Sequence, residues 1–239
     1  KQNVSFGGID ESPIPYLFSE PFGDFVGSVG SDLENVKQIV LAYTNHRDGN
    51  YRTLSLFALV RGWRDDPKTI EILSRLVLED DFVSLRIIAV GLLVDYALTS
   101  PQSLQLLIDR VVNDKHMIIR SITISTLVES FSDKLQILPL LRERAVQDNE
   151  ASVRSTAVSA LAEHYREDAQ TLPLLRERAA QDEHEGVRRA AVSALAEHYR
   201  EDAQTLPVLR ERAENDPTPW LREKCKELIN EIEGNKDSQ

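Results

Sequence analysis

A 34-residue repeat occupies most of this 239-residue chain and limits its fold more than any other feature. The blocks 139–172 and 173–206 differ at only seven of 34 positions, and stepping by 34 extends the register in both directions. One arginine recurs in every repeat: Arg52, Arg86, Arg120, Arg154, Arg188 and Arg222. Six positions before this arginine, five of the repeats have an aspartate: Asp80, Asp114, Asp148, Asp182 and Asp216. The first repeat has His46 at this position. Such repeats bury their apolar faces by stacking on their neighbours, so we expect a stacked array from about residue 31 onward.

Three columns of the repeat share one helix face because they are spaced by four residues. In one repeat they are Val153, Ala157 and Leu161. The middle column is small in every repeat, which lets two helices approach closely, so its last member, Cys225, is predicted to be a packing residue and not a reactive thiol. A second apolar run, at 138, 141 and 145 in this repeat, predicts another helix before it. The sequence therefore predicts an all-α fold of six helical hairpins.

The two ends of the array differ from its middle. Three columns that are apolar or aromatic in earlier repeats become Lys226, Asn230 and Glu233 in the last one. A terminal repeat needs a polar outer face, so we interpret the region near 205–233 as a capping repeat within a solenoid of residues 31–239. Residues 1–30 hold five of the ten glycines, and the chain begins with Lys1. We expect these residues to form an irregular segment that is either a cap or a junction to a missing upstream domain.

Composition excludes several classes of protein. The chain has 39 acidic and 28 basic residues and a net charge of -11, whereas nucleic-acid binders usually carry a basic face, so no nucleic acid is expected as a partner. No stretch is apolar and long enough to span a bilayer, and no signal peptide is evident, so no membrane association is expected. The single cysteine excludes a disulfide framework within one chain. We therefore expect a cytoplasmic protein.

The sequence offers no catalytic residues and no metal or cofactor site. It has no glycine-rich phosphate loop, nucleophile elbow or zinc-hydrolase helix. His164 and His198 occupy equivalent positions one repeat apart, and packed helices lie about 8–10 Å from each other. Two imidazoles at that separation do not share a zinc ion, whose nitrogen ligands lie about 2.0–2.1 Å away. We therefore expect no metal, no cofactor and no enzymatic activity.

An acidic stripe is the one surface feature that suggests a function. The position two residues after the last apolar column is Arg61 in the first repeat and acidic in the others: Asp95, Glu129, Glu163, Glu197 and Glu231. One interpretation is a solvated face that duplication has copied. The other is a groove, on the concave surface, for a protein or peptide with a basic surface. Of the seven differences between the two nearly identical blocks, six lie between Asn149 and Thr156, which suggests either drift in a turn or a tuned contact.

The motif of the second helix resembles the HEAT-like repeat. The tetratricopeptide and ankyrin patterns, which have similar lengths, are missing. Instead Asp148 and a short turn precede Val-Arg-Ser-Thr-Ala-Val-Ser-Ala-Leu at 153–161, and the resemblance extends over about 31–233. It implies a right-handed α-α superhelix in which the aspartate and arginine columns, such as Asp148 and Arg154, form a ladder between neighbouring hairpins.

The amino-acid sequences of segments 61–67 and 172–179 resemble those of the C-terminal repeat regions of bacterial, especially cyanobacterial, NACHT-type signalling ATPases. That resemblance implies a non-catalytic sensor or regulatory module of a larger protein. The alternative is a chromophore-handling protein similar to the HEAT-like phycobilin lyases, although no arginine-rich bilin pocket is evident. HEAT-like DNA glycosylases form a third class, and the acidic stripe disfavours it. The identity of the partner and the oligomeric state stay open.

Overall fold

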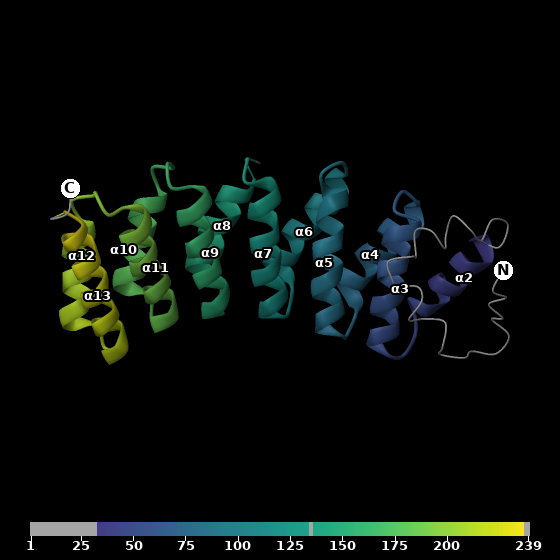
Figure 1. Cartoon of the computed structure of the whole chain (residues 1–239), viewed down its shortest axis with the longest axis horizontal. Helices are drawn as coiled ribbons and strands as arrows, with labels where there is room; N and C mark the ends of the chain where they lie inside the picture. Colours follow the sequence, from purple (N-terminus) through teal and green to yellow (C-terminus); the bar gives the residue numbers. More distant parts are fainter. Residues whose placement is uncertain (1–32, 134–135, 237–239) are drawn as a thin grey trace. The chain divides into compact units, whose positions relative to one another are not determined.

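The computed structural model describes residues 33–133 and 136–236, and within these ranges the chain forms helices and no strands (Figure 1). The helices follow one another as six pairs: α2 (Leu33–Tyr43) and α3 (Gly49–Gly62), α4 (Pro67–Glu79) and α5 (Val83–Ala97), α6 (Pro101–Asn113) and α7 (Met117–Phe131), α8 (Ile137–Gln147) and α9 (Ala151–His164), α10 (Thr171–Gln181) and α11 (Glu185–His198), α12 (Thr205–Asn215) and α13 (Pro219–Lys236). The predicted all-α fold of repeated HEAT-like hairpins is confirmed. The predicted N-terminal segment 1–30 lies outside the described residues.

The chain divides into two compact units, Lys1–Leu106 and Leu107–Gln239. In the first unit α2 packs on α3 and α4 packs on α5. Val36 and Val40 of α2 are buried against Ala58 and Leu59 of α3. The side chain of Asp66 caps α4 by accepting a hydrogen bond from the backbone N–H of Lys68 at 2.8 Å, as expected for an aspartate directly before a helix that begins with proline.

In the second unit the hairpins α8–α9, α10–α11 and α12–α13 pack consecutively, and α7, α9, α11 and α13 form a row of neighbouring second helices (Figure 1). The columns predicted to face the core are buried: Val153, Ala157 and Leu161 on α9 have no exposed surface. Cys225 is also fully buried, and burial raises the pKa of its thiol to about 11. Its predicted role as a small packing residue is confirmed.

The first helices of the second unit begin two residues before a proline. α8, α10 and α12 start at Ile137, Thr171 and Thr205, so each proline is the third residue of its helix. The backbone N–H groups of the first turn have no partner within the helix, so a proline there removes no helical hydrogen bond. The proline is therefore compatible with a continuous helix at this position.

Buried arginines link neighbouring hairpins within each unit. Arg154 donates from Nε and Nη2 to the carboxylate of Asp182, at 3.0 and 2.9 Å, and from Nη1 to the carbonyl of Asp148 at 2.9 Å. Arg120 and Arg188 make the same bidentate pairs with Asp148 and Asp216. The ladder that the resemblance implies is thus present. In these three pairs the arginine donates to the aspartate 28 residues later, in the following hairpin.

The ion pairs of the ladder shift the pKa values of the groups that form them. Burial by itself raises the pKa of Asp182, but hydrogen bonds from Arg154 and from the backbone N–H of His184 outweigh it, and the pKa lies below its ordinary value. The hydrogen bond to Asp182 likewise raises the pKa of Arg154. Both groups are therefore charged at neutral pH, and each buried charge has a buried partner.

The outer face of α13 is more polar than the same face of α11. Lys226 and Asn230 are exposed, whereas the equivalent Val192 and Ala196 are buried. The carboxylate of Glu233 accepts a hydrogen bond from Arg210 at 2.6 Å. A capping repeat needs such a face, and the assignment of 205–233 as that repeat remains a proposal.

Candidate binding groove

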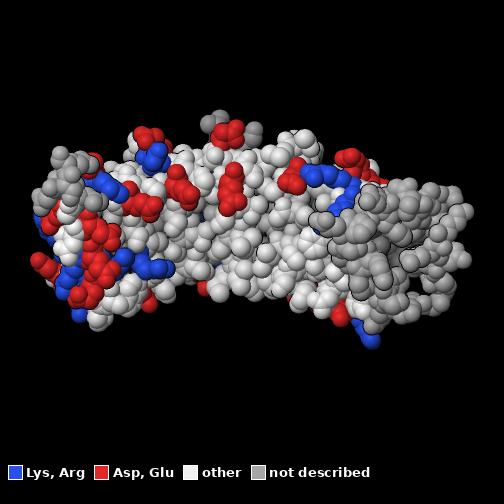
Figure 2. All heavy atoms as spheres, in the orientation of Figure 1, with Lys and Arg blue, Asp and Glu red and all other residues white. Residues whose placement is uncertain are grey.

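The second helices of the repeats present one face to solvent, and this face carries the predicted acidic stripe. On α7, α9 and α11 a serine column is followed by a glutamate column: Ser125, Ser159 and Ser193, then Glu129, Glu163 and Glu197. The two columns lie four residues apart, so within each helix the serine and the glutamate stand one turn apart on the same side. Figure 2 shows carboxylates in a row across this face.

The three glutamates lie in the last turn of their helices. Glu129 is two residues before the end of α7, and Glu163 and Glu197 are each one residue before the ends of α9 and α11. The C-terminal end of a helix carries a partial negative charge of roughly half an electron, which adds to the charge of a carboxylate placed there. The edge formed by these helix ends is therefore strongly negative.

Little in the surroundings neutralises these carboxylates. All three side chains are exposed, and among the described residues no lysine or arginine forms an ion pair with them. The imidazole Nε2 of His164 lies 3.9 Å from the carboxylate of Glu163, and this imidazole is charged only when it is protonated. The glutamates are therefore available to a cation from another molecule.

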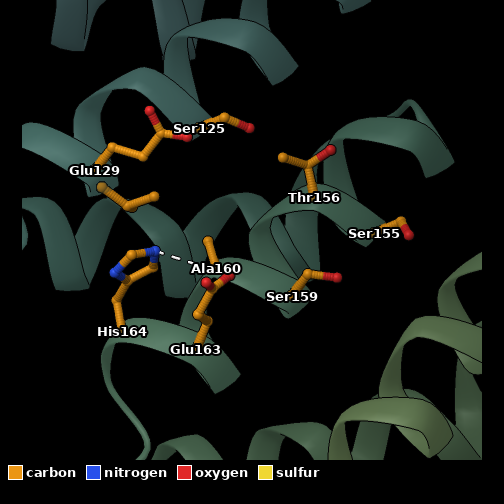
Figure 3. Close-up of a pocket in the computed structure, with 9 residues that line it drawn as sticks. Ser125, Glu129, Ser155, Thr156, Ser159, Ala160, Glu163 and His164 are labelled. Carbon is orange, nitrogen blue, oxygen red and sulfur yellow. Dashed lines mark ion pairs between the residues drawn. The ribbon is translucent and has the colours of Figure 1, made fainter.

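A groove lies between α7 and α9, with a volume of about 310 Å³. Figure 3 shows Ser125 and Glu129 on α7 facing Thr156, Ser159 and Glu163 on α9. His164 closes the end of the groove next to Glu163 (Figure 3). We call this the α7/α9 groove.

A second groove lies between α9 and α11, with a volume of about 370 Å³. Its lining includes Ser159, Glu163, Ser193, Glu197 and His198, so Ser159 and Glu163 line both grooves. Arg189 of α11 also lines it. We call this the α9/α11 groove.

The structure separates the five predicted stripe residues into three groups. Glu129, Glu163 and Glu197 line the two grooves. Glu231 is exposed on α13 and lines neither of them. Asp95 belongs to the other unit, where Arg64 donates to it at 3.3 Å and partly neutralises it. The candidate site therefore consists of the three central glutamates with their serines and histidines.

Part of this lining is not among the predicted site residues. It consists of His164 and His198, for which the sequence excluded only a shared zinc ion, and of the serine column. Stepping by 34 from Ser125 to Ser159 and Ser193 was the signal that could have identified it. Hydroxyls beside carboxylates can donate to and accept from the backbone of a bound chain while the carboxylates bind its cations.

The described residues form neither a metal-binding cluster nor a membrane-spanning helix. Within residues 33–133 and 136–236, no group of three or more His, Cys, Asp or Glu side chains is arranged to hold a metal ion. In the same part of the chain, no helix combines the length and the apolar character that crossing a membrane requires.

Comparison with known proteins supports the HEAT-like fold. A family model for HEAT repeats matches residues 138–230. The crystal structure of YibA from Escherichia coli is similar with a TM-score of 0.55 and 18% sequence identity, over 92% of this chain and 81% of YibA. No curated protein matches the sequence. At this identity the similarity to YibA concerns the fold alone, and nothing in these matches bears on the NACHT-type or phycobilin lyase resemblance.

Proposed function

We propose that this protein is a non-catalytic scaffold that binds a basic segment of another protein along the exposed face of α7, α9 and α11. The observation that carries the proposal is the row of Glu129, Glu163 and Glu197 along two adjacent grooves. These three glutamates are exposed, and no lysine or arginine of the described part of the chain pairs with them. A like charge at a helix C-terminus costs about 0.3–1 kcal/mol at low ionic strength. A bound cation would offset this cost, so the row favours a basic ligand.

The net charge of -11 supports the same kind of partner. An acidic protein attracts basic partners over a distance set by the ionic strength, which is about 8 Å at physiological salt and about 30 Å at 0.01 M. Steering of this kind mainly raises the rate of association, and the contacts within the grooves then determine which segment stays bound.

We infer further that the scaffold is the sensor or regulatory module of a larger bacterial signalling protein and acts in the cytoplasm. This inference rests on the similarity of segments 61–67 and 172–179 to the repeat regions of NACHT-type ATPases. The reading frame of the gene tests it. A nucleotide-binding or effector domain encoded upstream of Lys1 is the expected result, and a start codon directly before Lys1 would contradict it.

The binding proposal is tested by reversing the three charges in the grooves. The variant Glu129→Lys, Glu163→Lys, Glu197→Lys should lose most of its affinity for a fluorescein-labelled ten-residue lysine peptide, measured by fluorescence anisotropy at 0.05 and 0.15 M salt. The loss should be greater at the lower salt concentration because screening is weaker there.

The matched control reverses three acids on the first helices, Glu143, Glu177 and Glu211, whose side chains are about half exposed and also recur every 34 residues. Both variants change the net charge equally. Equal losses of affinity would mean that the peptide responds only to total charge, and the assignment of the grooves as the site would then be wrong. Circular dichroism of both variants shows whether the helices are intact.

A further inference from the structure

One hydrogen bond orients the ladder arginines in the same way. The Nη1 group donates to the carbonyl oxygen of the residue six positions earlier, in the turn before the helix. This bond is 2.8 Å long for Arg52 and Arg120, 2.9 Å for Arg154 and Arg188, and 2.6 Å for Arg222. Because the guanidinium is planar and rigid, holding Nη1 at this carbonyl also directs its other edge, formed by Nε and Nη2.

In four of these arginines, that edge binds a carboxylate of the following hairpin. Nε and Nη2 donate to the two oxygens of one aspartate at 2.7–3.0 Å in the pairs Arg52–Asp80, Arg120–Asp148, Arg154–Asp182 and Arg188–Asp216. In three of the pairs Nη2 also reaches a side-chain oxygen of the next residue: Asp81 at 3.0 Å, Asn149 at 3.1 Å and Glu183 at 3.4 Å. The edge therefore recognises an aspartate that is followed by an acid or an amide.

Arg222 is held in the same way but has different surroundings. Its side chain is half-buried, and among the described residues no carboxylate accepts from its Nε or Nη2. Lys226 lies one turn later on the same side of α13 and is exposed. The exposed carboxylate of Glu223 accepts from Lys226 at 2.7 Å, and such a pair can exchange with a carboxylate from another molecule. Because the guanidinium is already oriented, binding a carboxylate costs it little conformational entropy.

Two possible occupants fit this end of the second unit poorly. A further hairpin needs an apolar face, but Lys226 and Asn230 stand where α11 has a buried valine and a buried alanine. A second copy of this chain, stacked in the ladder register, would bring His46 and Arg47 to the guanidinium of Arg222 in place of an aspartate and its neighbour. Neither residue supplies a carboxylate, and Arg47 would repel the guanidinium. The acceptor that fits is a carboxylate of a different protein.

We propose that Arg222, with Lys226 beside it, is a docking site for an acidic turn of another protein. In this turn an aspartate followed by an acid or an amide takes the position that Asp182 and Glu183 have at Arg154. The site lies on a different helix from the two grooves and takes a ligand of the opposite charge, so it goes beyond the proposed function. A scaffold with both sites holds a basic segment and an acidic turn at the same time.

The chain itself supplies the probe for this site. A peptide with the sequence of residues 179–187 contains the aspartate and the glutamate that bind Arg154. Its matched control has asparagine in place of that aspartate. Each peptide is titrated into the ¹⁵N-labelled protein at 0.15 M salt, which screens the repulsion between the acidic protein and the acidic peptide. The backbone N–H signals of α13 give the Kd, and the Nε–H signal of Arg222 shows whether the guanidinium takes part.

The aspartate peptide should shift the Nε–H signal of Arg222 and should bind about three- to tenfold more tightly than the asparagine peptide. This factor is typical of a charge-assisted hydrogen bond to a partly exposed group. The variant Arg222→Lys keeps the charge but loses the pair of parallel donors, so it should weaken binding of the aspartate peptide by a similar factor. The variant Lys226→Met should weaken it less, because this lysine supplies only a point charge.

Lys224→Gln is the matched control for Arg222→Gln. Each variant removes one positive charge, and Lys224 lies two residues away on the opposite side of α13, where it pairs with Glu227 at 3.1 Å. Arg222→Gln should weaken binding about three- to tenfold, and Lys224→Gln should leave it nearly unchanged.

Four results would overturn the site: no saturable binding of the aspartate peptide, equal binding of the two peptides, an unshifted Nε–H signal of Arg222, or equal losses in Arg222→Gln and Lys224→Gln. Dimers in sedimentation that disappear in Arg222→Gln would also overturn it, because a second copy would then be the occupant. The comparison of the two peptides uses the unmodified protein and does not depend on the folding of a variant. Since both peptides are acidic, none of these results bears on the binding of a basic segment in the grooves.

Discussion

Replacing Asp182 by alanine is expected to destabilise the second unit by about 3–5 kcal/mol, the usual cost of removing one partner of a buried ion pair. The carboxylate of Asp182 is only 2% exposed. It accepts two hydrogen bonds from Arg154, at 3.0 and 2.9 Å, and one from the backbone N–H of His184 at 3.0 Å. Without it the guanidinium of Arg154, which is only 6% exposed, stays buried with two of its donors unpaired. The free energy of unfolding in urea measures the loss.

Glu183 is a control that contacts the same guanidinium. Its carboxylate lies 3.4 Å from Arg154 but is 86% exposed, so solvent screens the pair. Exposed pairs contribute about 0.2–1 kcal/mol, and Glu183→Ala should therefore cost less than about 1 kcal/mol. The double variant Arg154→Met, Asp182→Ala should recover part of the stability lost in Asp182→Ala, because it removes the unpaired buried charge.

Similar losses for Asp182→Ala and Glu183→Ala would refute the reasoning, since burial would then not determine the strength of the ladder. Because repeats can unfold separately, hydrogen exchange should accompany the urea measurement. It should show the loss of protection centred on α9, α10 and α11, the helices that meet at this ion pair.

Three further predictions concern protonation, the cysteine and the glycines. The pKa values of Asp182 and Asp216 lie below the ordinary 3.8. Their contribution to stability is therefore complete above pH 3.8 and is lost as the pH falls through the pKa of the folded state. The variant Asp182→Asn should flatten the pH dependence of the urea midpoint below about pH 4. Cys225, with a pKa of about 11 and no exposed surface, should react with iodoacetamide at pH 8 only as the protein unfolds, and rapid labelling in the absence of denaturant would contradict its packing role. Gly91→Ala should stabilise the first unit by about 0.5–1 kcal/mol, because alanine favours a helix over glycine and the added methyl group would have no heavy atom within 4 Å. Gly49→Ala should show no such gain, because its Cβ would clash with the ring of Phe82. Equal thermal shifts in the two variants would refute this comparison.

Much of the fold could be predicted from the sequence because, in stacked hairpins, residues that recur at the repeat period occupy equivalent positions and are buried in the same way. Positions such as Val153, Ala157 and Leu161 recur on one face of every second helix, and that face meets the same neighbours in each repeat. The fold class, the number of hairpins and the packing role of Cys225 follow from this local regularity. The acidic and histidine columns were visible for the same reason.

Contacts between successive hairpins depended on tertiary structure. Periodicity shows that Arg154, Asp148 and Asp182 belong to recurring columns, but not which aspartate the guanidinium reaches; the stagger between hairpins brings it to Asp182. The same stagger places Arg189 in a groove with Glu163 and Glu197. Tertiary structure also places Arg64 beside Asp95, whereas within residues 33–133 and 136–236 no lysine or arginine pairs with Glu129, Glu163 or Glu197. A repeat length determines which residues are equivalent, whereas the offset and rotation between neighbouring hairpins determine which of them meet.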